Sequence, residues 1–163
     1  MIGIIASSAA LYNFGTEKVS NGEFDTNITG WAKTGNSTIV RNSEVSGNGT
    51  TGYLVYNILV NTSGDRFYQN IGLQANKRYL CEFWYRTSVI TGNLFILTCS
   101  NTSTLANTIV HYLITPSSTW TKISCIINTN TLSYPHFSIM KDGAVTTSVG
   151  TLEIDGISVK EIL

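Results

Sequence analysis

The amino-acid sequence predicts an all-β protein built as a sandwich of two antiparallel sheets. Only 12% of the 163 residues are charged, whereas 42% are hydrophobic, and the hydrophobic residues come in short runs. Ser, Thr, Asn and Gly fill the intervals between these runs, which is the residue usage of turns that join strands. Helical spacing of apolar residues is almost absent. A chain of this length is expected to form one domain with a sizeable core.

Nine segments have the composition and spacing of short strands. They are residues 37–41, 52–60, 66–71, 79–88, 93–99, 108–115, 119–128, 136–141 and 150–160. Turn-forming residues separate several of them, as at 46–49, 61–65 and 141–143. Pro116 and Pro135 are expected in loops, because a proline removes a hydrogen-bond donor from a strand ladder. Nine short strands at this spacing indicate two packed sheets.

Residues 1–18 are predicted to form an N-terminal arm, followed by a single domain over residues 19–163. Ile2, Ile4 and Ile5 make the start of the arm apolar. A secretory signal is not favoured, because the apolar run lacks a basic start and is short and interrupted. The arm must nevertheless pack against something. Both a neighbouring subunit and the arm's own domain remain open as its partner.

The charge pattern argues against nucleic acids and membranes as partners. The formal net charge is zero, and Lys and Arg are scattered singly along the chain. Proteins that bind nucleic acids or anionic membranes carry clustered basic residues. No stretch after the arm approaches the length of a membrane-spanning helix.

The cysteines indicate a protein that folds in a reducing compartment. Cys81, Cys99 and Cys125 are an odd number, and no two have the close spacing of a zinc or redox motif. Cys81 and Cys125 lie within strong strand patterns, where a free thiol behaves as a small buried hydrophobe. The alternative is one disulfide between adjacent strands.

The segment 79–88 has the most informative alternation in the chain. The residues expected to face the core are Tyr79, Cys81, Phe83 and Tyr85. The other face then carries Trp84 between Glu82 and Arg86. An aromatic ring beside hydrogen-bonding groups is typical of a sugar-binding surface, since the ring contacts C–H groups and the polar side chains contact hydroxyls. The alternative is an ordinary ion pair between Glu82 and Arg86 beside a covered tryptophan.

Three tyrosines are further candidates for this ligand-binding surface. Tyr68, Tyr112 and Tyr134 lie in or next to predicted strands, so each could also be a core residue or a loop anchor. We include Tyr68 and Tyr112 in the predicted ligand-binding set.

Signals for catalysis are missing from the sequence. It lacks a Gly-x-Ser-x-Gly elbow, a His-Glu-x-x-His motif and a phosphate-binding loop. His111 and His136 lie in separate strand patterns, and the ten acidic residues are scattered. We therefore expect a protein that is not an enzyme. A small glycoside-active enzyme with paired carboxylates is the remaining catalytic alternative.

Motifs at the two ends of the domain carry a family resemblance. The opening reads Val-Ser-Asn-Gly-Glu-Phe-Asp at residues 19–25, with Trp31 following, and the close at residues 152–161 contains Ile-Asp-Gly-Ile-Ser-Val. Between them stand Tyr68-Gln69, the aromatic segment 79–87 and Trp120-Thr121. This pattern resembles the jelly-roll carbohydrate-binding modules attached to xylanases and glucanases. The resemblance implies a jelly roll in which the opening and the close are neighbours.

The resemblance also implies a structural calcium ion near Asp25 and Asp155. In the family, carboxylates from the opening and the close commonly hold calcium together with backbone carbonyls, and calcium prefers such oxygen ligands. Here the opening has Glu-Phe-Asp where Asp-Phe-Glu is usual, and the close has Asp-Gly where two acids often stand. Without a metal, both residues would act as hydrogen-bonding groups in turns or at strand ends.

A carbohydrate-binding jelly roll with an apolar arm and free cysteines looks like a structural or decoration protein of a bacteriophage particle. We expect it on a capsid, head fibre or tail, where it would be assembled in the host cytoplasm and serve glycan adhesion. Its partners would be other virion subunits, contacted through the arm, and cell-surface or mucosal glycans. The alternative is a standalone or enzyme-associated carbohydrate-binding module that is secreted.

Overall fold

The computed structural model describes residues 12–58, 65–88, 95–100, 109–131, 134–141 and 150–163, and every regular element in these ranges is a strand. Sheet A contains β1 (Phe14–Glu17), β3 (Thr38–Val45), β4 (Thr51–Ile58), β6 (Arg78–Ser88), β9 (Thr121–Asn128) and β11 (Gly150–Ile162). Sheet B contains β2 (Ala32–Thr34), β5 (Arg66–Leu73), β7 (Phe95–Ser100), β8 (Ile109–Ile114) and β10 (Tyr134–Lys141). The described ranges hold no helix long and apolar enough to cross a membrane.

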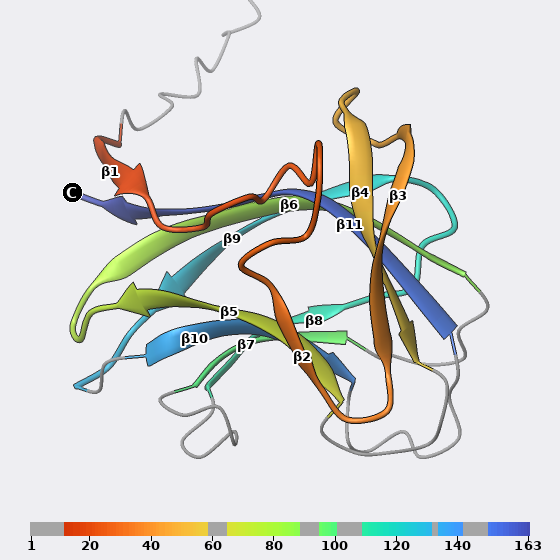
Figure 1. Cartoon of the computed structure of the whole chain (residues 1–163). Helices are drawn as coiled ribbons and strands as arrows, with labels where there is room; N and C mark the ends of the chain where they lie inside the picture. The colour runs from red at the N-terminus through yellow and green to blue at the C-terminus, as the bar shows by residue number, and fades with distance from the viewer. Residues whose placement is uncertain (1–11, 59–64, 89–94, 101–108, 132–133, 142–149) are drawn as a thin grey trace, which may run out of the picture.

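The two sheets stack face to face, which confirms the predicted antiparallel jelly-roll sandwich (Figure 1). Sheet A has the order β3-β4-β11-β6-β9, with β1 also paired to β11, and sheet B has the order β2-β5-β10-β7-β8. Each of the nine predicted segments overlaps one of these strands. The sequence does not predict β1 and β2, because four and three residues are too few for a periodic pattern.

One proline lies in a strand rather than in a loop. Pro135 is the second residue of β10, whereas Pro116 lies outside the strands as predicted. The pairing of β10 with β5 shifts its register between Tyr134 and His136. A residue at such an irregularity drops out of the regular ladder, so the missing N–H of proline is tolerated there.

Part of the predicted N-terminal arm forms a strand of sheet A. β1 lies beside the end of β11 (Figure 1), and in their pairing Phe14 is opposite Ile162 and Glu17 is opposite Lys160. The arm predicted for residues 1–18 therefore includes a strand of sheet A. Residues 1–11 lie outside the described part of the chain, so the partner of that segment stays a prediction.

Aromatic side chains fill the centre of the sandwich. The ring of Trp31 lies 5.6 Å from Phe24, 5.5 Å from Phe67 and 6.1 Å from Phe137, measured between ring centroids. Phe67 and Phe137 come from β5 and β10, and both are fully buried. Burial of a side chain of this size contributes about 1.5–3 kcal/mol. The opening segment is thus anchored to sheet B by its own aromatic residues.

The opening and the close of the domain are neighbours, as expected. The N–H of Ile157 donates a hydrogen bond to the carbonyl of Gly22 at 3.1 Å, and the N–H of Lys18 donates to the carbonyl of Val159 at 2.9 Å. The opening is irregular rather than a strand, because Asn21 and Phe24 have left-handed backbone angles, with φ of 52° and 50°.

Candidate functional site

The outer face of sheet A carries three of the predicted ligand-binding residues. The alternation predicted for β6 is confirmed: Cys81, Phe83 and Tyr85 are buried in the core, whereas Glu82, Trp84 and Arg86 are half-buried on the opposite face. Trp84 pairs across the ladder with Asp155 of β11 and Lys122 of β9.

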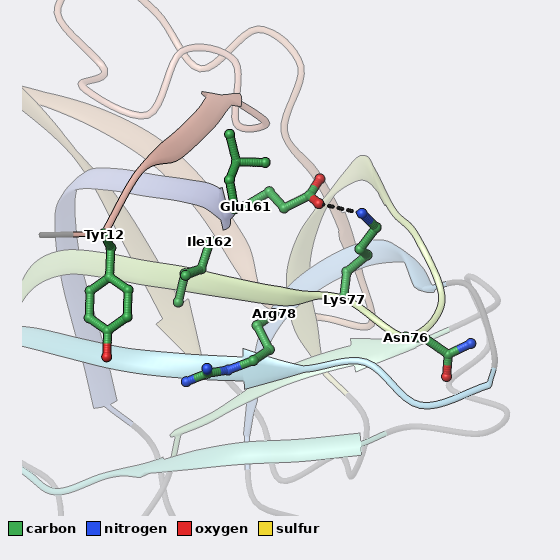
Figure 2. Close-up of a pocket in the computed structure, with 7 residues that line it drawn as sticks. Tyr12, Asn76, Lys77, Arg78, Glu161 and Ile162 are labelled. Atoms are coloured by element: carbon green, nitrogen blue, oxygen red, sulfur yellow. Dashed lines mark ion pairs between the residues drawn. The ribbon is translucent and has the colours of Figure 1, made fainter. Parts of the chain in front are cut away.

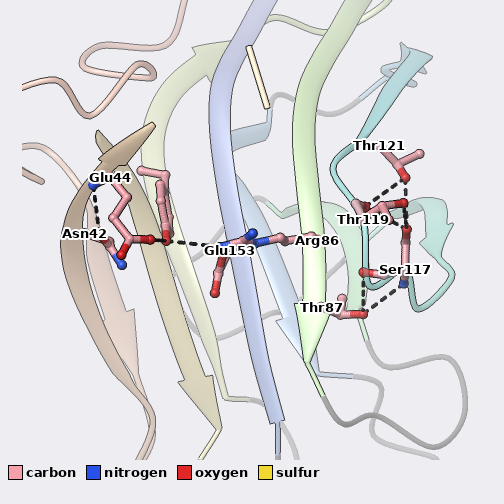
Figure 3. A network of polar contacts seen from close by, with 9 residues as sticks. Asn42, Glu44, Arg86, Thr87, Ser117, Thr119, Thr121 and Glu153 are labelled. Carbon is pink, nitrogen blue, oxygen red and sulfur yellow. Dashed lines mark hydrogen bonds and ion pairs between the residues drawn. The ribbon is translucent and has the colours of Figure 1, made fainter. Parts of the chain in front are cut away.

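The charged groups on this face are already paired. Glu82 forms an ion pair with Lys122 at 3.0 Å, so the alternative of an ion pair between Glu82 and Arg86 is wrong. Arg86 instead pairs with Glu153 on the neighbouring strand β11 (Figure 3). Arg86 also donates to the Tyr53 hydroxyl at 3.2 Å. Burial lowers the pKa of Arg86, but the hydrogen bond and charge of Glu153 outweigh it and raise that pKa.

Two aromatic rings, those of Trp120 and Tyr53, also contact the Arg86 guanidinium. It lies 5.0 Å from the ring centroid of Trp120 and 5.7 Å from that of Tyr53, within the range of cation–π attraction. The Trp84 ring lies beside Gly156, where an added Cβ would come 3.5 Å from it. The donors and acceptors that flank Trp84 are therefore satisfied by the protein itself.

Tyr68 lies on the other side of the molecule. On β5, Phe67, Gln69 and Ile71 are buried toward the core, so Tyr68 faces outward from sheet B. The structure therefore does not bring Tyr68 together with Trp84. Tyr112 is also in sheet B, on β8 opposite Leu97, but its side chain is outside the described part, as is that of Tyr134.

Tyr68 is the centre of a second polar and aromatic cluster. The ring of His136, from β10, meets the Tyr68 ring edge-on at 5.5 Å, and the Arg66 guanidinium lies 5.0 Å from the Tyr68 centroid. Asn70 follows on the same face and is exposed. We call Arg66, Tyr68, Asn70 and His136 the Tyr68 face.

The Tyr68 face contains buried nitrogen atoms with unused hydrogen-bonding capacity. Arg66 is only 1% exposed. Within the described part of the chain, Arg66 Nε, Arg66 Nη1 and His136 Nδ1 have no hydrogen-bond partner. Burial and the charge of Arg66 lower the pKa of His136, so its imidazole is neutral at pH 7. Leaving a buried donor without a partner costs about 1–3 kcal/mol. Such a cost is typical of sites that a ligand or water completes.

The sequence pattern does not mark Arg66 and His136 as members of a site. Arg66 could have been noticed, because it stands two residues before Tyr68 in a predicted strand and so shares its face. No local signal joins His136 to them, since the pairing of β10 with β5 sets that contact.

The predicted calcium ligands have different surroundings. Asp155 is completely buried and accepts hydrogen bonds from the hydroxyls of Ser46 and Thr50. Its Oδ1 has no partner among the described residues. Burial raises the pKa of Asp155 above its usual value. The Asp25 side chain is exposed, and no described hydrogen bond links it to Asp155.

The oxygens around Asp155 suit a hard cation. The turn between β3 and β4 brings Asn48 Oδ1 within 2.6 Å of both hydroxyls that contact Asp155. Glu23, not Asp25, reaches this cluster, because its carboxylate accepts a 2.7 Å hydrogen bond from Asn48 Nδ2. The described residues contain no group of three or more His, Cys, Asp or Glu side chains that could hold a metal. The donor set is therefore mainly hydroxyl, amide and single-carboxylate oxygens, which calcium accepts.

A surface pocket of about 570 Å³ lies in sheet A where β6 begins and β11 ends (Figure 2). Tyr12, Arg78 and Ile162 line it, and the ion pair between Lys77 and Glu161, 2.7 Å long, borders it. It is next to β1, where the predicted arm enters the sheet. It has no nucleophile paired with a base among its described residues.

Comparison with solved structures supports the fold. The CBM22-1–GH10 modules of endo-1,4-β-D-xylanase 10B from Clostridium thermocellum, solved with xylohexaose, are 20% identical with a TM-score of 0.69, and the match covers 88% of this chain and 28% of that one. The CBM22-1 xylan-binding domain from Paenibacillus barcinonensis is 11% identical with a TM-score of 0.69. That match covers 91% of this chain and 96% of that domain's chain. The enzymatically active domain of tailspike protein 4 from bacteriophage CBA120 is 19% identical with a TM-score of 0.65. That match covers 90% of this chain and 21% of the tailspike chain.

The chain thus spans less than a third of the xylanase and tailspike chains that it resembles. No curated protein sequence matches it. The family model described as carbohydrate binding domain matches residues 16–139, which is well over half of the chain. The chain belongs to this family of carbohydrate-binding domains.

Proposed function

We propose that the protein binds a glycan on the Tyr68 face, without catalysing a reaction. The observation that carries this proposal is the set of partnerless nitrogens around an outward-facing aromatic ring. A pyranose offers matching chemistry, since its C–H groups stack on an aromatic ring and its hydroxyls can donate to or accept from nitrogen. Neutral His136 can do either, whereas Arg66 only donates.

The competing surface around Trp84 has less to offer a sugar. Its flanking groups, Glu82 and Arg86, are engaged with Lys122 and Glu153. A sugar would have to displace these ion pairs before it could use the charged groups. The predicted ligand-binding role of Trp84, Glu82 and Arg86 therefore remains as the alternative to the Tyr68 face.

Replacement of Tyr68 should distinguish the two faces. Stacking of an aromatic ring on a ligand ring is worth about 1–3 kcal/mol in other recognition sites. We therefore expect Tyr68→Ala to weaken glycan retention roughly tenfold or more. Affinity electrophoresis in gels containing xylan or β-glucan, preceded by a glycan array on the wild-type chain, would measure the change.

Trp84→Ala is the matched control, since it removes a half-buried aromatic ring from the opposite outer face. Its retention should stay near that of the wild type, and circular dichroism should show both variants folded. Loss of binding in Trp84→Ala alone would move the site to sheet A. An array without any bound glycan would contradict the proposal as a whole.

We also propose that Asp155, with Glu23 and the turn between β3 and β4, holds a structural calcium ion. The support is the partnerless Oδ1 of a fully buried carboxylate within an oxygen-rich cluster. The ion would neutralise the buried charge and tie the close of the domain to the β3–β4 turn. Asp25 is not part of this proposed ligand set.

The setting that we propose for the domain is a bacteriophage particle, on its capsid, head fibre or tail. A similar fold in a phage tailspike chain supports this setting. Other virion subunits would then be the partners of residues 1–11, in an oligomeric assembly that displays the Tyr68 face to cell-surface or mucosal glycans. Secretion as a standalone or enzyme-associated module is the alternative, and the similarity to xylanase modules supports it.

Deletion of residues 2–11 tests this setting while keeping β1 in the sheet. The truncated chain should fold normally and fail to join the particle, because it lacks the apolar segment that would dock on another subunit. Mass spectrometry of particles purified from lysed host cells would detect the full-length chain only. Incorporation of the truncated chain as well as the full-length chain would contradict the docking role of the arm. Recovery of the full-length chain in the secreted fraction alone would favour a secreted carbohydrate-binding module.

A further inference from the structure

The cysteines of β6 and β9 face each other across the ladder. Cys81 lies directly opposite Cys125 in the antiparallel pairing of these strands. Directly opposed residues of an antiparallel pair have Cα atoms about 4.5–5.5 Å apart. A disulfide has a Cα separation of 4.4–6.8 Å, so the pair needs only a small adjustment to bond.

The two thiols differ in their access to solvent. Cys81 is completely buried, whereas Cys125 is half-buried. β9 is an edge strand of sheet A, so one flank of Cys125 has no hydrogen-bonded strand among the described residues. A small reagent can therefore reach Cys125 first and Cys81 only through it.

We propose that Cys81 and Cys125 form an oxidative modification site, in which a small-molecule disulfide converts the pair to a reversible cross-strand disulfide. Cys125 is the more exposed of the two thiols, and a side-chain hydrogen bond from Cys81 lowers its pKa against the opposing effect of burial. Cys125 is consequently the attacking group.

The exchange proceeds in two balanced steps. The Cys125 thiolate attacks one sulfur of the small disulfide, forms a mixed disulfide and releases one small thiolate. The Cys81 thiol then loses its proton and attacks the Cys125 sulfur, which releases the second small thiol. The two cysteines are oxidised by two electrons in total, and the small disulfide is reduced to two thiols.

The cross-link would join the edge strand β9 to its neighbour β6 in sheet A. Edge strands have the fewest partners and open most easily. The reduced dithiol would persist in a reducing cytoplasm, and the disulfide would form once the domain is exposed to an oxidising medium. Both proposed settings, a released particle and a secreted module, include that change.

The experiment uses the full-length chain, reduced, freed of reductant and then incubated with oxidised glutathione. Alkylation after denaturation should find one free thiol per chain instead of three, and peptide mapping should join residue 81 to residue 125. The melting temperature should rise by about 5–10 °C for a loop of this length, and a dithiol reductant should reverse the change.

Three variants assign the roles. Cys99→Ser should still form the disulfide, because Cys99 is on β7 in the other sheet, opposite Phe137. Cys81→Ser should keep glutathione on Cys125, whereas Cys125→Ser should leave Cys81 unmodified. Three free thiols after long incubation of the native wild-type chain, or a disulfide that includes Cys99, would overturn the proposal. If a variant at position 81 or 125 does not fold, the thiol count and the peptide map of the wild type and Cys99→Ser decide.

Discussion

Calcium should raise the melting temperature of the wild-type chain, and Asp155→Asn should abolish the rise. An ion that binds only the folded state stabilises it in proportion to the logarithm of its concentration over the dissociation constant. At about a hundredfold excess over that constant the gain is about 2.7 kcal/mol, which corresponds to about 5–10 °C for a domain of this size. Differential scanning calorimetry in millimolar calcium and in chelator measures the difference.

Asp25→Asn is the control for this experiment, because it makes the same change at an exposed carboxylate of the opening. It should keep the full response to calcium. Loss of the response in Asp25→Asn, or its persistence in Asp155→Asn, would contradict the proposed ligand set. A wild-type melting curve that is the same in calcium and in chelator would leave Asp155 as a structural hydrogen-bonding residue.

The pH dependence in chelator should have the opposite sign from that of an ordinary paired carboxylate. Burial raises the pKa of Asp155 in the folded state, so the folded chain holds this proton more tightly than the unfolded chain. The stabilisation from this group is complete below the unfolded-state pKa and is lost as the pH rises through the folded-state pKa. Relative to Asp155→Asn, the chelated wild type should therefore lose stability between acidic and neutral pH, and calcium should reverse that loss.

Gly22→Ala should lower the free energy of unfolding by about 3 kcal/mol, measured by urea denaturation. A Cβ at residue 22 would lie 2.0 Å from the carbonyl oxygen of Ile157, which no real contact allows. The atom in the way belongs to the backbone of β11, so relief requires the opening to move away from the close. That movement would also break the hydrogen bond from the N–H of Ile157 to the carbonyl of Gly22.

Gly72→Ala is the matched control for the glycine prediction. A Cβ there meets nothing within 4 Å, but its φ of 61° is in the left-handed region. The change should therefore cost only about 1 kcal/mol, from backbone strain. A Gly22→Ala midpoint no lower than that of Gly72→Ala would mean that the opening does not press on β11 as closely as the structure has it.

Local sequence patterns were sufficient for the strands and for the direction of their side chains. The alternation in residues 79–88 placed Cys81, Phe83 and Tyr85 in the core and Trp84 outside, because side chains alternate across any extended strand. The motifs at the two ends of the domain likewise indicated that the opening and the close are neighbours, and the hydrogen bond from the N–H of Ile157 to the carbonyl of Gly22 agrees.

Alternation along one strand does not reveal which sheet the strand joins or which residues of neighbouring strands lie beside it. For that reason only the tertiary structure could separate Tyr68 from Trp84, although both are outward-facing aromatic residues of strongly patterned strands. Strand pairing likewise decided that Glu82 meets Lys122, that His136 comes beside Tyr68, and that two cysteines 44 residues apart lie directly opposite each other.

The tertiary structure also decided which acid of the opening approaches Asp155. In an extended strand, Glu23 and Asp25 would point to the same side and could not be told apart. Both side chains are exposed, but the left-handed backbone at Phe24 turns the chain between them, so that Glu23 accepts a hydrogen bond from Asn48. The sequence by itself determined that two carboxylates stand in the opening, and the backbone path, fixed by the burial of Phe24 against Trp31, determined which of them approaches the close.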